Sequence, residues 1–392
     1  MQEIIETYLE KYLPRKDIIH RLPVSLPISK VWPELQKARK DKSESLPLLS
    51  IDGKPFWWVL TENISSQADE VISLARREIV FDRPEYEEAF REAVLDEAVY
   101  SSVIEGAFTT KKEAREFIHE GRSPKNKSEQ MVKNNYEALT YVLEHIDESI
   151  TEQTIFDIYA LVTKDTLEAD VPTNAYRSES VFVQSSRGEI VHTAPEAEKV
   201  SGMMASLLEF LTNNELSPLI KACIAHFYFV YVHPFIDGNG RTARALSFMM
   251  LLQAGYDFFR YFSISGVIAE ERAKYYKAIK DVEDDDFDMT YFIDYYTGML
   301  ARAVKAMEER LVDKVVMEQT LDKLKAAGMN SRVIEGAKWI LTSPNQSITI
   351  KAWQKKFGVV LETARQDLFK LEDAGIVHRK LVKRQYVFEV KK

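Results

Sequence analysis

Apolar residues recur every three or four positions along most of the chain, which is the spacing of amphipathic helices. From Glu85 this pattern continues until Gly106, a residue type that commonly ends a helix. The same spacing predicts further helices over residues 63–79, 128–146, 151–167, 195–211, 218–232, 241–254, 269–279 and 289–311. Asn63, Ser128 and Thr151 stand at the starts of three of them and are suited to cap the first turn.

The period changes to two in the stretch "SVFVQSSRGEIVHT", residues 180–193. Alternation on both sides of residues 185–188 predicts one β-hairpin inside an otherwise helical region. Residues 1–80 predict a short helix together with Pro-containing segments. The predicted fold class is therefore mainly α, a helical bundle with a single hairpin.

After about residue 312 the pattern becomes helix, short helix, helix and strand-turn-strand. This order is typical of a small winged helix-turn-helix, with residues 361–374 in the place of the recognition helix. Residues 351–392 hold eleven Lys and Arg against five Asp and Glu. Four basic residues lie at the expected wing: Arg379, Lys380, Lys383 and Arg384. DNA is one partner that this charge suggests, and a protein-docking or dimerisation module is the alternative.

Composition changes this picture little. Of the 392 residues, 45% are hydrophobic and 29% are charged, as is ordinary for a soluble globular protein of two or three domains. The net charge of −9 argues against a nucleic-acid or membrane surface spread over the whole molecule. The single cysteine, Cys223, excludes an internal disulfide and lies in an apolar run, as a core residue would. With no signal core and no apolar run near the ~20 residues of a membrane span, we expect a cytoplasmic protein without a membrane partner.

The twelve residues "HPFIDGNGRTAR", 233–244, differ from core-building sequence. They follow an apolar helix that stops at a proline, and Gly238 and Gly240 provide a turn with uncovered N–H groups before the next helix. A glycine-flanked turn at a helix N-terminus is an anion site. Arg241 and Arg244 lie three residues apart at the start of that helix, so they can clamp two phosphoryl groups of a polyphosphate.

Three other side chains of this stretch complete the expected site. Asp237 can hold a Mg²⁺ that also bridges phosphate oxygens. Asn239 adds a neutral donor for the anion. His233 titrates near neutral pH and suits a general base that takes a proton from an incoming hydroxyl. The sequence therefore predicts a phosphoryl-transfer site for a nucleoside triphosphate and Mg²⁺.

The stretch resembles throughout the signature of the Fic-domain family, His-Pro-Phe-x-Asp/Glu-Gly-Asn-Gly-Arg-x-x-Arg. The hairpin, "NAYR" before it and "KYYKAI" after it agree, so the resemblance covers roughly residues 85–300. It implies a Fic-type helical bundle that transfers AMP from ATP to a Ser, Thr or Tyr hydroxyl of a target protein and releases pyrophosphate. It also makes a homodimer a reasonable expectation. The chain would then comprise an N-terminal Fic-associated segment 1–84, a catalytic domain 85–311 and a winged-helix-like domain 312–392.

The resemblance implies roles for individual residues, with His233 as the base and Asp237 as the Mg²⁺ ligand. The residues expected along the nucleotide are Gly238, Asn239, Gly240, Arg241, Thr242, Ala243 and Arg244. Tyr275 and Tyr276 resemble the tyrosine pair beside the base and ribose. The hairpin resembles the flap that registers an extended target segment, unless it is only structural, and its first residues are Val181, Phe182, Val183 and Gln184. Where family members often carry an Asn about two turns after the tyrosines, this chain has "KDVEDDD".

A second motif, "SSVIEG", ends the helix that begins near Glu85. It resembles the inhibitory motif Ser/Thr-x-x-x-Glu-Gly/Asn, with Ser101, Glu105 and Gly106 in place. Ser101 and Glu105 share one helix face because they are four residues apart. The resemblance implies that Glu105 pairs with Arg244 and thereby inhibits transfer in cis; the alternative is an ordinary solvent-facing glutamate. Without this inhibition the protein is expected to modify itself as well.

Two other functions stay open from the sequence. The first is a Fic enzyme that transfers another phosphate-containing group, or removes AMP with the help of the inhibitory glutamate. The second is a DNA-binding regulator that acts through its C-terminal domain. The intact motif favours AMP transfer, because Asp237 and both arginines suit a nucleoside triphosphate.

Overall fold

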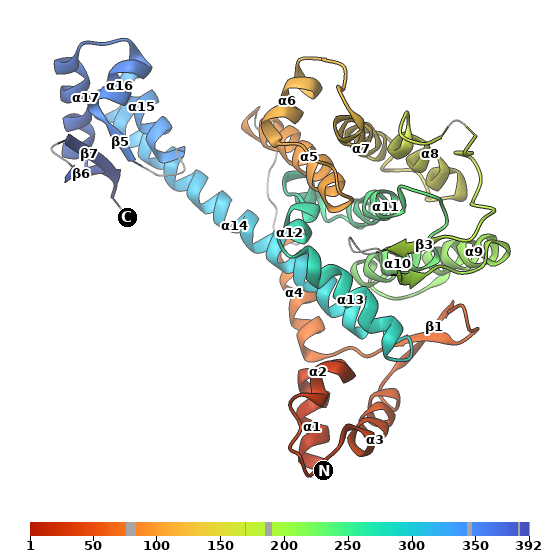
Figure 1. Cartoon of the computed structure of the whole chain (residues 1–392). Helices are drawn as coiled ribbons and strands as arrows, with labels where there is room; N and C mark the ends of the chain where they lie inside the picture. Colours follow the sequence, from red (N-terminus) through yellow and green to blue (C-terminus); the bar gives the residue numbers. More distant parts are fainter. Residues whose placement is uncertain (76–83, 169, 185–189, 343–346, 383–384, 392) are drawn as a thin grey trace. The chain divides into compact units, whose positions relative to one another are not determined.

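The structure is a computed structural model that describes residues 1–75, 84–168, 170–184, 190–342, 347–382 and 385–391. The chain divides into two compact units, Met1–Lys305 and Ala306–Lys392 (Figure 1). Helices dominate both units, as the hydrophobic pattern predicts. Within the described ranges, no helix is both long enough and apolar enough to cross a lipid bilayer.

The first unit begins with three helices and a hairpin, where the sequence predicts one short helix. These elements are α1 Gln2–Lys11, α2 Arg15–Ile19, α3 Ile28–Lys40, β1 Glu44–Leu49 and β2 Pro55–Trp58, with β1 and β2 antiparallel. Tyr8, Ile18, Trp32 and Leu35 form a small buried cluster between the helices. Pro33 lies inside α3, so one of the Pro-containing segments in which the sequence predicts no helix is helical in the structure.

A buried arginine joins this N-terminal part to the rest of the unit. Arg39 is 1% exposed and donates to the carbonyl oxygens of Tyr8 and Leu13 and to the Tyr291 hydroxyl. Tyr291 belongs to a helix more than two hundred residues further along the chain. The N-terminal part therefore lies in the same compact unit as the helices that follow it, and the expected Fic-associated segment 1–84 stays a prediction.

Five helices follow the N-terminal part, and their caps differ in part from the predicted ones. They are α4 Glu62–Ala75, α5 Pro84–Ile104, α6 Lys111–His119, α7 Lys127–Glu144 and α8 Glu152–Thr163. Thr151 caps α8 as predicted. The predicted cap Asn63 lies inside α4 and donates to Asp294 instead. Asn126 caps α7, whereas the predicted cap Ser128 accepts a hydrogen bond from a neighbouring loop.

The remaining elements of the first unit surround two apolar helices. They are β3 Phe182–Gln184, β4 Ile190–Thr193, α9 Ala197–Asn213, α10 Pro218–Val232, α11 Asn239–Gln253, the 3₁₀ helix η1 Asp257–Tyr261, α12 Ile264–Glu270 and α13 Arg272–Asp284. Helix α14, Thr290–Ala326, begins in this unit and is longer than the predicted 289–311. Both α10 and α11 are buried on nearly every side, as is typical of a central helix. Figure 1 shows α11 between α10 and the pair α7 and α8, which it contacts.

Helix α5 is fixed to its neighbours by buried polar contacts as well as by apolar packing. Glu97 is 5% exposed and accepts from the Ser263 hydroxyl at 2.7 Å and from the Ser265 amide at 2.9 Å, where α12 begins. Asn135 of α7 donates to the carbonyl oxygen of Ala98 at 3.3 Å. The middle of α5 is therefore held on two sides.

The second unit packs three helices and a three-stranded antiparallel sheet around its own core. Beside the end of α14, its elements are α15 Ser331–Thr342, β5 Ser347–Thr349, α16 Ile350–Phe357, α17 Leu361–Asp373, β6 Val377–Val382 and β7 Gln385–Val390, with sheet order β5-β7-β6. Trp353, Leu368 and Phe388 are fully buried at its centre. The order of elements matches the predicted one, except that the sequence misses β5.

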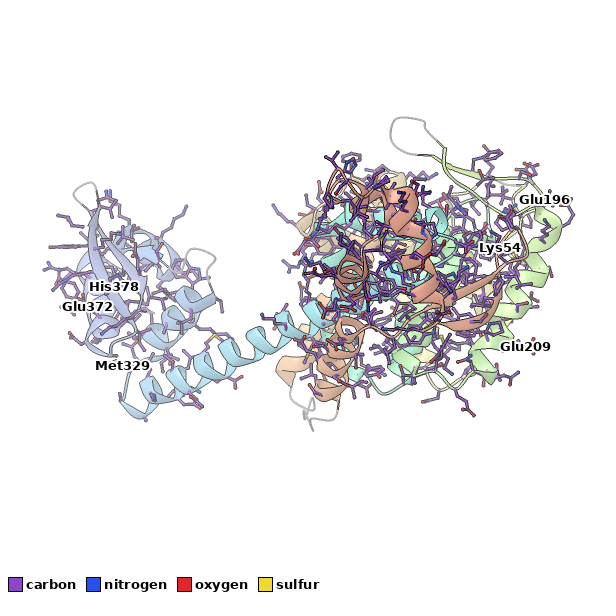
Figure 2. All side chains as sticks on the ribbon, turned by 90° about the horizontal axis from the view of Figure 1, so that it is seen from below. Lys54, Glu196, Glu209, Met329, Glu372 and His378 are labelled. Carbon is purple, nitrogen blue, oxygen red and sulfur yellow. The ribbon has the colours of Figure 1, made fainter. Side chains whose placement is uncertain are left out.

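Exposed charges of the second unit pair with one another. Glu372 of α17 lies 3.4 Å from Arg379 of β6, and His378 lies 3.6 Å from Glu389; Figure 2 labels Glu372 and His378. Two of the four basic residues expected at the wing, Lys383 and Arg384, lie outside the described residues.

Gly336 of α15 allows a prediction about the core of the second unit. A Cβ at this position would lie 1.8 Å from the Trp353 ring, which is fully buried and donates to Asp367, so the ring cannot move aside. We expect Gly336→Ala to destabilise this unit by about 1–3 kcal/mol through overpacking, measured as a lower thermal unfolding temperature. Gly202→Ala in α9 is the control, because its Cβ would meet nothing within 4 Å. Unfolding of Gly336→Ala at the wild-type temperature would contradict this packing.

Candidate active site

The candidate site lies where the chain turns back between α10 and α11. His233 directly follows α10 and has left-handed backbone angles, with φ 51° and ψ 59°. Its amide donates to the Phe229 carbonyl at 3.0 Å, and its Nδ1 lies 3.2 Å from the Val230 carbonyl oxygen. Since a carbonyl only accepts, Nδ1 carries the proton and Nε2 keeps its lone pair. The backbone at the end of α10 therefore presents the basic nitrogen of His233 away from the helix.

Burial keeps this imidazole neutral. It lowers the pKa of His233 to about 4, against the opposing effect of the Val230 carbonyl, which favours the charged ring. At neutral pH His233 is in the form that can accept a proton.

Asn239 holds the loop that follows His233. Its side-chain oxygen accepts from the Phe235 amide at 2.9 Å and its nitrogen donates to the Phe235 carbonyl at 2.7 Å. The Phe235 ring in turn stacks on Tyr159 with 3.6 Å between ring centres. The Asn239 side chain thus fixes the loop backbone through its oxygen and one of its two N–H donors, and the expectation that it also offers a donor to an anion stays a prediction.

Gly238 starts α11 with φ 80°, a conformation that L side chains rarely adopt. A Cβ there would also lie 2.7 Å from the Thr163 side chain, so close packing adds a second reason for glycine. The first bond inside the helix runs from the Thr242 amide to the Gly238 carbonyl at 2.9 Å. The amides of residues 239–241 precede that bond and have no partner within the helix, which makes this end attractive to an anion.

A carboxylate of the protein lies at this end of α11. Glu105 Oε1 is 2.8 Å from Arg244 Nη2 and would be 2.2 Å from a Cβ on Gly240. Gly240 therefore gives the carboxylate room to lie directly against the backbone. The Glu105–Arg244 contact is the one that the sequence resemblance implies.

Arg244 is held from three directions and is 3% exposed. Its Nε donates to the Ser101 hydroxyl and its Nη2 to the Ser101 carbonyl oxygen, both at 2.8 Å. Burial acts against the guanidinium charge, but Glu105 and its other neighbours keep the pKa of Arg244 above the ordinary value. The buried Nη1 atom has no hydrogen-bond partner among the described residues, so it is available to another anionic oxygen. Gly106 ends α5 with φ 92° beside these residues.

Arg241 is engaged differently from Arg244. It is fully buried, and its Nη1 donates to the Val162 carbonyl at 2.9 Å while its Nη2 lies 3.4 Å from Asp237. Burial lowers the pKa of its guanidinium. This arginine thus braces the loop against the end of α8, in addition to any phosphate contact. The side chains of Thr242 and Ala243, also expected along the nucleotide, are fully buried in the core.

Asp237 is the carboxylate of the loop that could hold a metal ion. Its Oδ1 accepts from the Gly238 amide at 2.6 Å, and its side chain is 45% exposed at the entrance of the loop. No group of three or more metal-ligating side chains occurs among the residues that the structure describes. One accessible carboxylate beside an anion site fits Mg²⁺, which usually binds through one or two carboxylates and the phosphates of its substrate.

The two tyrosines expected beside the nucleoside, Tyr275 and Tyr276, differ in burial. Tyr275 is 2% exposed, and its hydroxyl lies 2.9 Å from Nε2 of the buried His226. Tyr276 is 36% exposed and packs against Arg272, whose guanidinium carbon is 5.5 Å from the ring centre. Of the pair, Tyr276 has the accessible ring face, whereas Tyr275 supports it from within the core.

The predicted hairpin is present as β3 and β4, paired antiparallel with Phe182 opposite Thr193, Val183 opposite His192 and Gln184 opposite Ile190. Val181 precedes β3, and Phe182 is 52% exposed. Behind the hairpin, His192 Nε2 lies 2.8 Å from the Tyr231 carbonyl and Nδ1 lies 2.7 Å from Glu283 Oε1. The strand is thereby fixed to the ends of α10 and α13, and Glu283 falls in the "KDVEDDD" stretch that departs from the family pattern.

Sequence reasoning assigned no role to His192, Glu283 or Arg177. His192 and Glu283 line a hollow of about 320 Å³ near the hairpin. Arg177, the last residue of "NAYR", donates to the His233 carbonyl at 2.8 Å. Its position in a motif that agrees with the family was the available signal. Of its carbonyl partners, Glu179 is close in sequence, but Pro195, Val232 and His233 are not.

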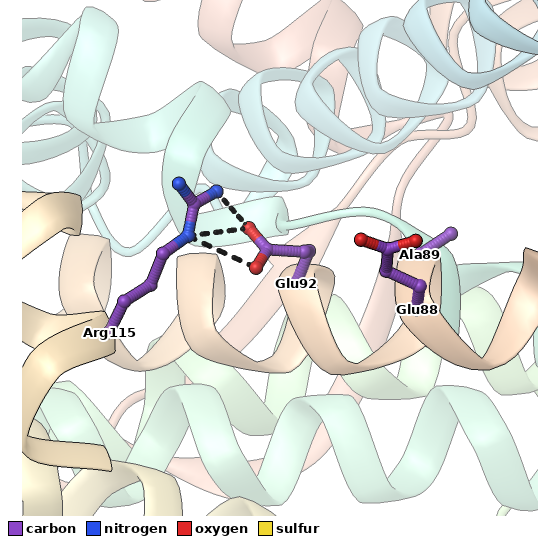
Figure 3. Close-up of a pocket in the computed structure, with 4 residues that line it drawn as sticks. All are labelled: Glu88, Ala89, Glu92 and Arg115. Atoms are coloured by element: carbon purple, nitrogen blue, oxygen red, sulfur yellow. Dashed lines mark hydrogen bonds and ion pairs between the residues drawn. The ribbon is translucent and has the colours of Figure 1, made fainter. Parts of the chain in front are cut away.

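Another hollow, of about 560 Å³, lies on α5 and α6 outside the residues of the candidate site (Figure 3). Arg115 of α6 reaches Glu92 of α5 across it, and Glu88 lies one turn further along α5. This ion pair joins the two helices.

Several known proteins similar to this chain in sequence belong to one family. Residues 149–251 match the profile of the Fic/DOC family. The protein adenylyltransferase Fic of Nematostella vectensis is 31% identical over 210 residues, which are 50% of this chain and 45% of the relative. That of Drosophila willistoni is 28% identical over 207 residues, 50% of this chain and 39% of the relative. The chain thus spans less than half the length of these curated relatives.

A solved structure is similar in fold over most of the chain. The crystal structure of a Fic family protein from Desulfovibrio desulfuricans G20 aligns with a TM-score of 0.56 at 22% identity, over 85% of this chain and 98% of that one. The profile match includes His233, the loop after it and Arg244. Residues 149–251 therefore match a Fic domain, as the sequence resemblance predicts, and the fold of the chain is similar to that of the Desulfovibrio protein.

Proposed function

We propose that this protein transfers AMP from ATP to a Ser, Thr or Tyr hydroxyl of a target protein. The observation that carries the proposal is a neutral His233 with a free Nε2 beside an anion site at the start of α11. Relatives that share half of this chain are named protein adenylyltransferase Fic, which supports the same chemistry.

The nucleotide binds through its phosphates at the start of α11. The free amides of residues 239–241 and Arg244 provide the positive charge, and Asp237 would hold the Mg²⁺ that accompanies ATP. When bound, the Mg²⁺ neutralises charge on the phosphate oxygens. Tyr276 offers its accessible ring face to the nucleoside.

The chemical step exchanges one bond at the α-phosphorus for another. The target hydroxyl loses its proton to His233 Nε2, and its oxygen forms a bond to the α-phosphorus. The bond from this phosphorus to the β-phosphate bridging oxygen breaks, and pyrophosphate leaves. Arg244 and the helix start stabilise the charge that develops on the leaving group. His233 then releases its proton to solvent.

Glu105 regulates this step in cis. Its carboxylate occupies the anion position over Gly240 and already pairs with Arg244, so it competes with the terminal phosphate of ATP. A nucleotide bound beside it loses the Arg244 contact, and its α-phosphate is not aligned with an incoming hydroxyl.

Transfer of another phosphate-containing group, or removal of AMP, would use the same residues. Mass spectrometry of the modified target separates these reactions from AMP transfer, because each leaves a different mass. The exposed hairpin residue Phe182 suits contact with a target segment. DNA binding has no comparable support, because the exposed face of α17 carries Glu362 and Asp373 beside Arg365 and Lys370.

Replacing the inhibitory carboxylate tests the regulation. We expect Glu105→Gly to raise the initial rate of AMP transfer at least about tenfold, because about 1.4 kcal/mol of competition for Arg244 corresponds to a factor of ten. The measurement is incorporation of label from α-labelled ATP by purified protein. Glu88→Gly removes the same charge from α5, the helix that Glu105 follows, but outside the site, and should leave the rate unchanged. Equal rates for Glu105→Gly and wild type would refute inhibition by Glu105.

Replacing the base tests the chemistry. In the Glu105→Gly background, His233→Ala should lower the rate of transfer by about 10²–10⁴-fold, the usual contribution of a general base. ATP affinity, measured by calorimetry, should stay within about threefold, since the phosphates bind elsewhere. His145→Ala is a matched control, because the His145 ring also meets a carbonyl at the end of its helix but outside the site. Full activity of His233→Ala would exclude this residue as the base.

The pKa of His233 sets the expected pH dependence. A base acts only when deprotonated, and a pKa of about 4 keeps His233 deprotonated through the mildly acidic range. Glu105 itself raises the pKa of His233, so its removal can only shift this pKa further down. The kcat/KM of Glu105→Gly should therefore persist from pH 7 down to about pH 5 and fall only at about pH 4 or below, rather than near the ordinary histidine value of about 6.5. Circular dichroism at each pH checks that the protein stays folded. A half-maximal rate near pH 6.5 would place the titrating base in a more exposed environment than the structure gives His233.

A further inference from the structure

Arg177 is a buried cation surrounded by main-chain carbonyl groups. It lies in the segment between α8 and β3 and is 5% exposed. Its guanidinium donates to four carbonyl oxygens: His233 at 2.8 Å, Glu179 at 2.7 Å, Pro195 at 2.6 Å and Val232 at 3.4 Å. Its own amide donates to the Pro234 carbonyl at 2.9 Å.

No carboxylate among the described residues forms an ion pair with Arg177. Burial alone lowers the pKa of its guanidinium. A buried charge without a counter-ion is costly, so this position needs a compensating interaction. Val232 and His233 supply it, because their carbonyl oxygens lie at the C-terminal end of α10, where the helix dipole favours a cation.

The carbonyl partners come from three segments that carry the expected chemistry. Val232 and His233 end α10, Glu179 precedes the β3–β4 hairpin and Pro195 follows it. One planar guanidinium thus closes the base of the hairpin and attaches it to the backbone of the expected base. A lysine could not reproduce this, because its ammonium is a single point with three donors rather than a rigid fork.

His233 needs such support because of its backbone. A non-glycine residue at φ 51° is held in a sparsely populated conformation, which persists only when its surroundings fix it. The Phe229 carbonyl holds the amide of His233 and Arg177 holds its carbonyl. A small rotation of this peptide would move the imidazole, and a displacement of about 1 Å can cost about 10²-fold in rate.

We propose that Arg177 is a positioning residue that sets the orientation of His233 and couples it to the β3–β4 hairpin. The proposal rests on the proposed function for its kinetic consequence, since Arg177 itself touches no reacting group. Its structural consequence, the coupling of the hairpin to His233, can be measured without turnover.

The kinetic test compares Arg177→Met and Arg177→Lys in the Glu105→Gly background. We expect kcat to fall about 10²-fold in Arg177→Met, with KM for ATP changed by no more than about threefold, because the phosphate site is built from α11 and Arg244. Arg177→Lys should be intermediate, since an ammonium recovers only part of the carbonyl contacts. Loss of ATP affinity in step with kcat would overturn a specific effect on His233.

The second test measures the titration of His233 and the amide exchange of the hairpin, neither of which requires catalysis. In Arg177→Met, NMR titration of the His233 ring should give a higher pKa than in the parent, because a nearby positive charge is gone; His192 and Glu105 also act on this ring and are unchanged. Amide exchange of residues 182–184 and 190–193 should become faster. Unchanged titration and unchanged exchange in the folded variant would overturn the proposal. These readouts decide it even if the Glu105→Gly parent transfers no AMP, an outcome that would refute only the proposed function.

Arg39→Met is the matched control for these experiments. Arg39 is also a buried arginine that donates to main-chain carbonyl oxygens, but it does so in the N-terminal helices. Its replacement should lower the unfolding temperature without changing kcat or the titration of His233. If Arg39→Met lowers kcat as much as Arg177→Met, the effect of Arg177 is general destabilisation and the proposal fails. Arg177→Lys provides the same comparison if Arg177→Met does not fold.

Discussion

The reversal of the chain between α10 and α11 is the constraint on which the candidate site depends. Two residues accept left-handed backbone angles there, His233 at its start and Gly238 at its end. The first directs an imidazole out of a fully packed helix, and the second starts a helix whose free amides face the same region. Apolar packing of α10 and stacking of Phe235 on Tyr159 hold the turn in place. A base and an anion site thus become neighbours through backbone geometry.

Electrostatics within the site follow from burial. Arg244 lies almost out of solvent, where a cation needs a partner, and Ser101 and Glu105 provide one. In the function we propose, a terminal phosphate is another such partner, and it would compete with Glu105 for the same guanidinium. Burial acts against the charge of His233 as well, and because its neighbours do not outweigh that effect, the pKa of His233 falls and the ring stays neutral. Burial therefore disfavours both charges, and the carboxylate of Glu105 offsets it at Arg244.

Local sequence signals predicted much of this arrangement, and tertiary contacts decided the rest. Helical spacing predicted α5, α8 and α10, and alternation predicted the hairpin, because each pattern is set by neighbours in the chain. Glycine chemistry predicted the turn at Gly238 for the same reason. Local signals could not predict the hydrogen bond of Arg241 to Val162 or that of Tyr275 to His226, because these partners are far apart in sequence. They also did not show that the side chain of Asn239 bonds to the backbone of Phe235. The helix α3 was missed because its proline lies inside it.

The anchoring of α5 limits how Glu105, which follows this helix, can move. The buried contacts of Glu97 and Ala98 hold the helix itself, whereas Glu105 directly follows its last residue, Ile104, and the Glu105 side chain is 28% exposed. If the whole helix moved away, the carboxylate of Glu97 would lose its hydrogen bonds to Ser263 and Ser265, and the apolar residues around it would lose their packing contacts. Swinging a single side chain about its own bonds disturbs none of them. Arg244 can therefore be uncovered by rotation of the Glu105 side chain alone, while helix α5 keeps its buried contacts.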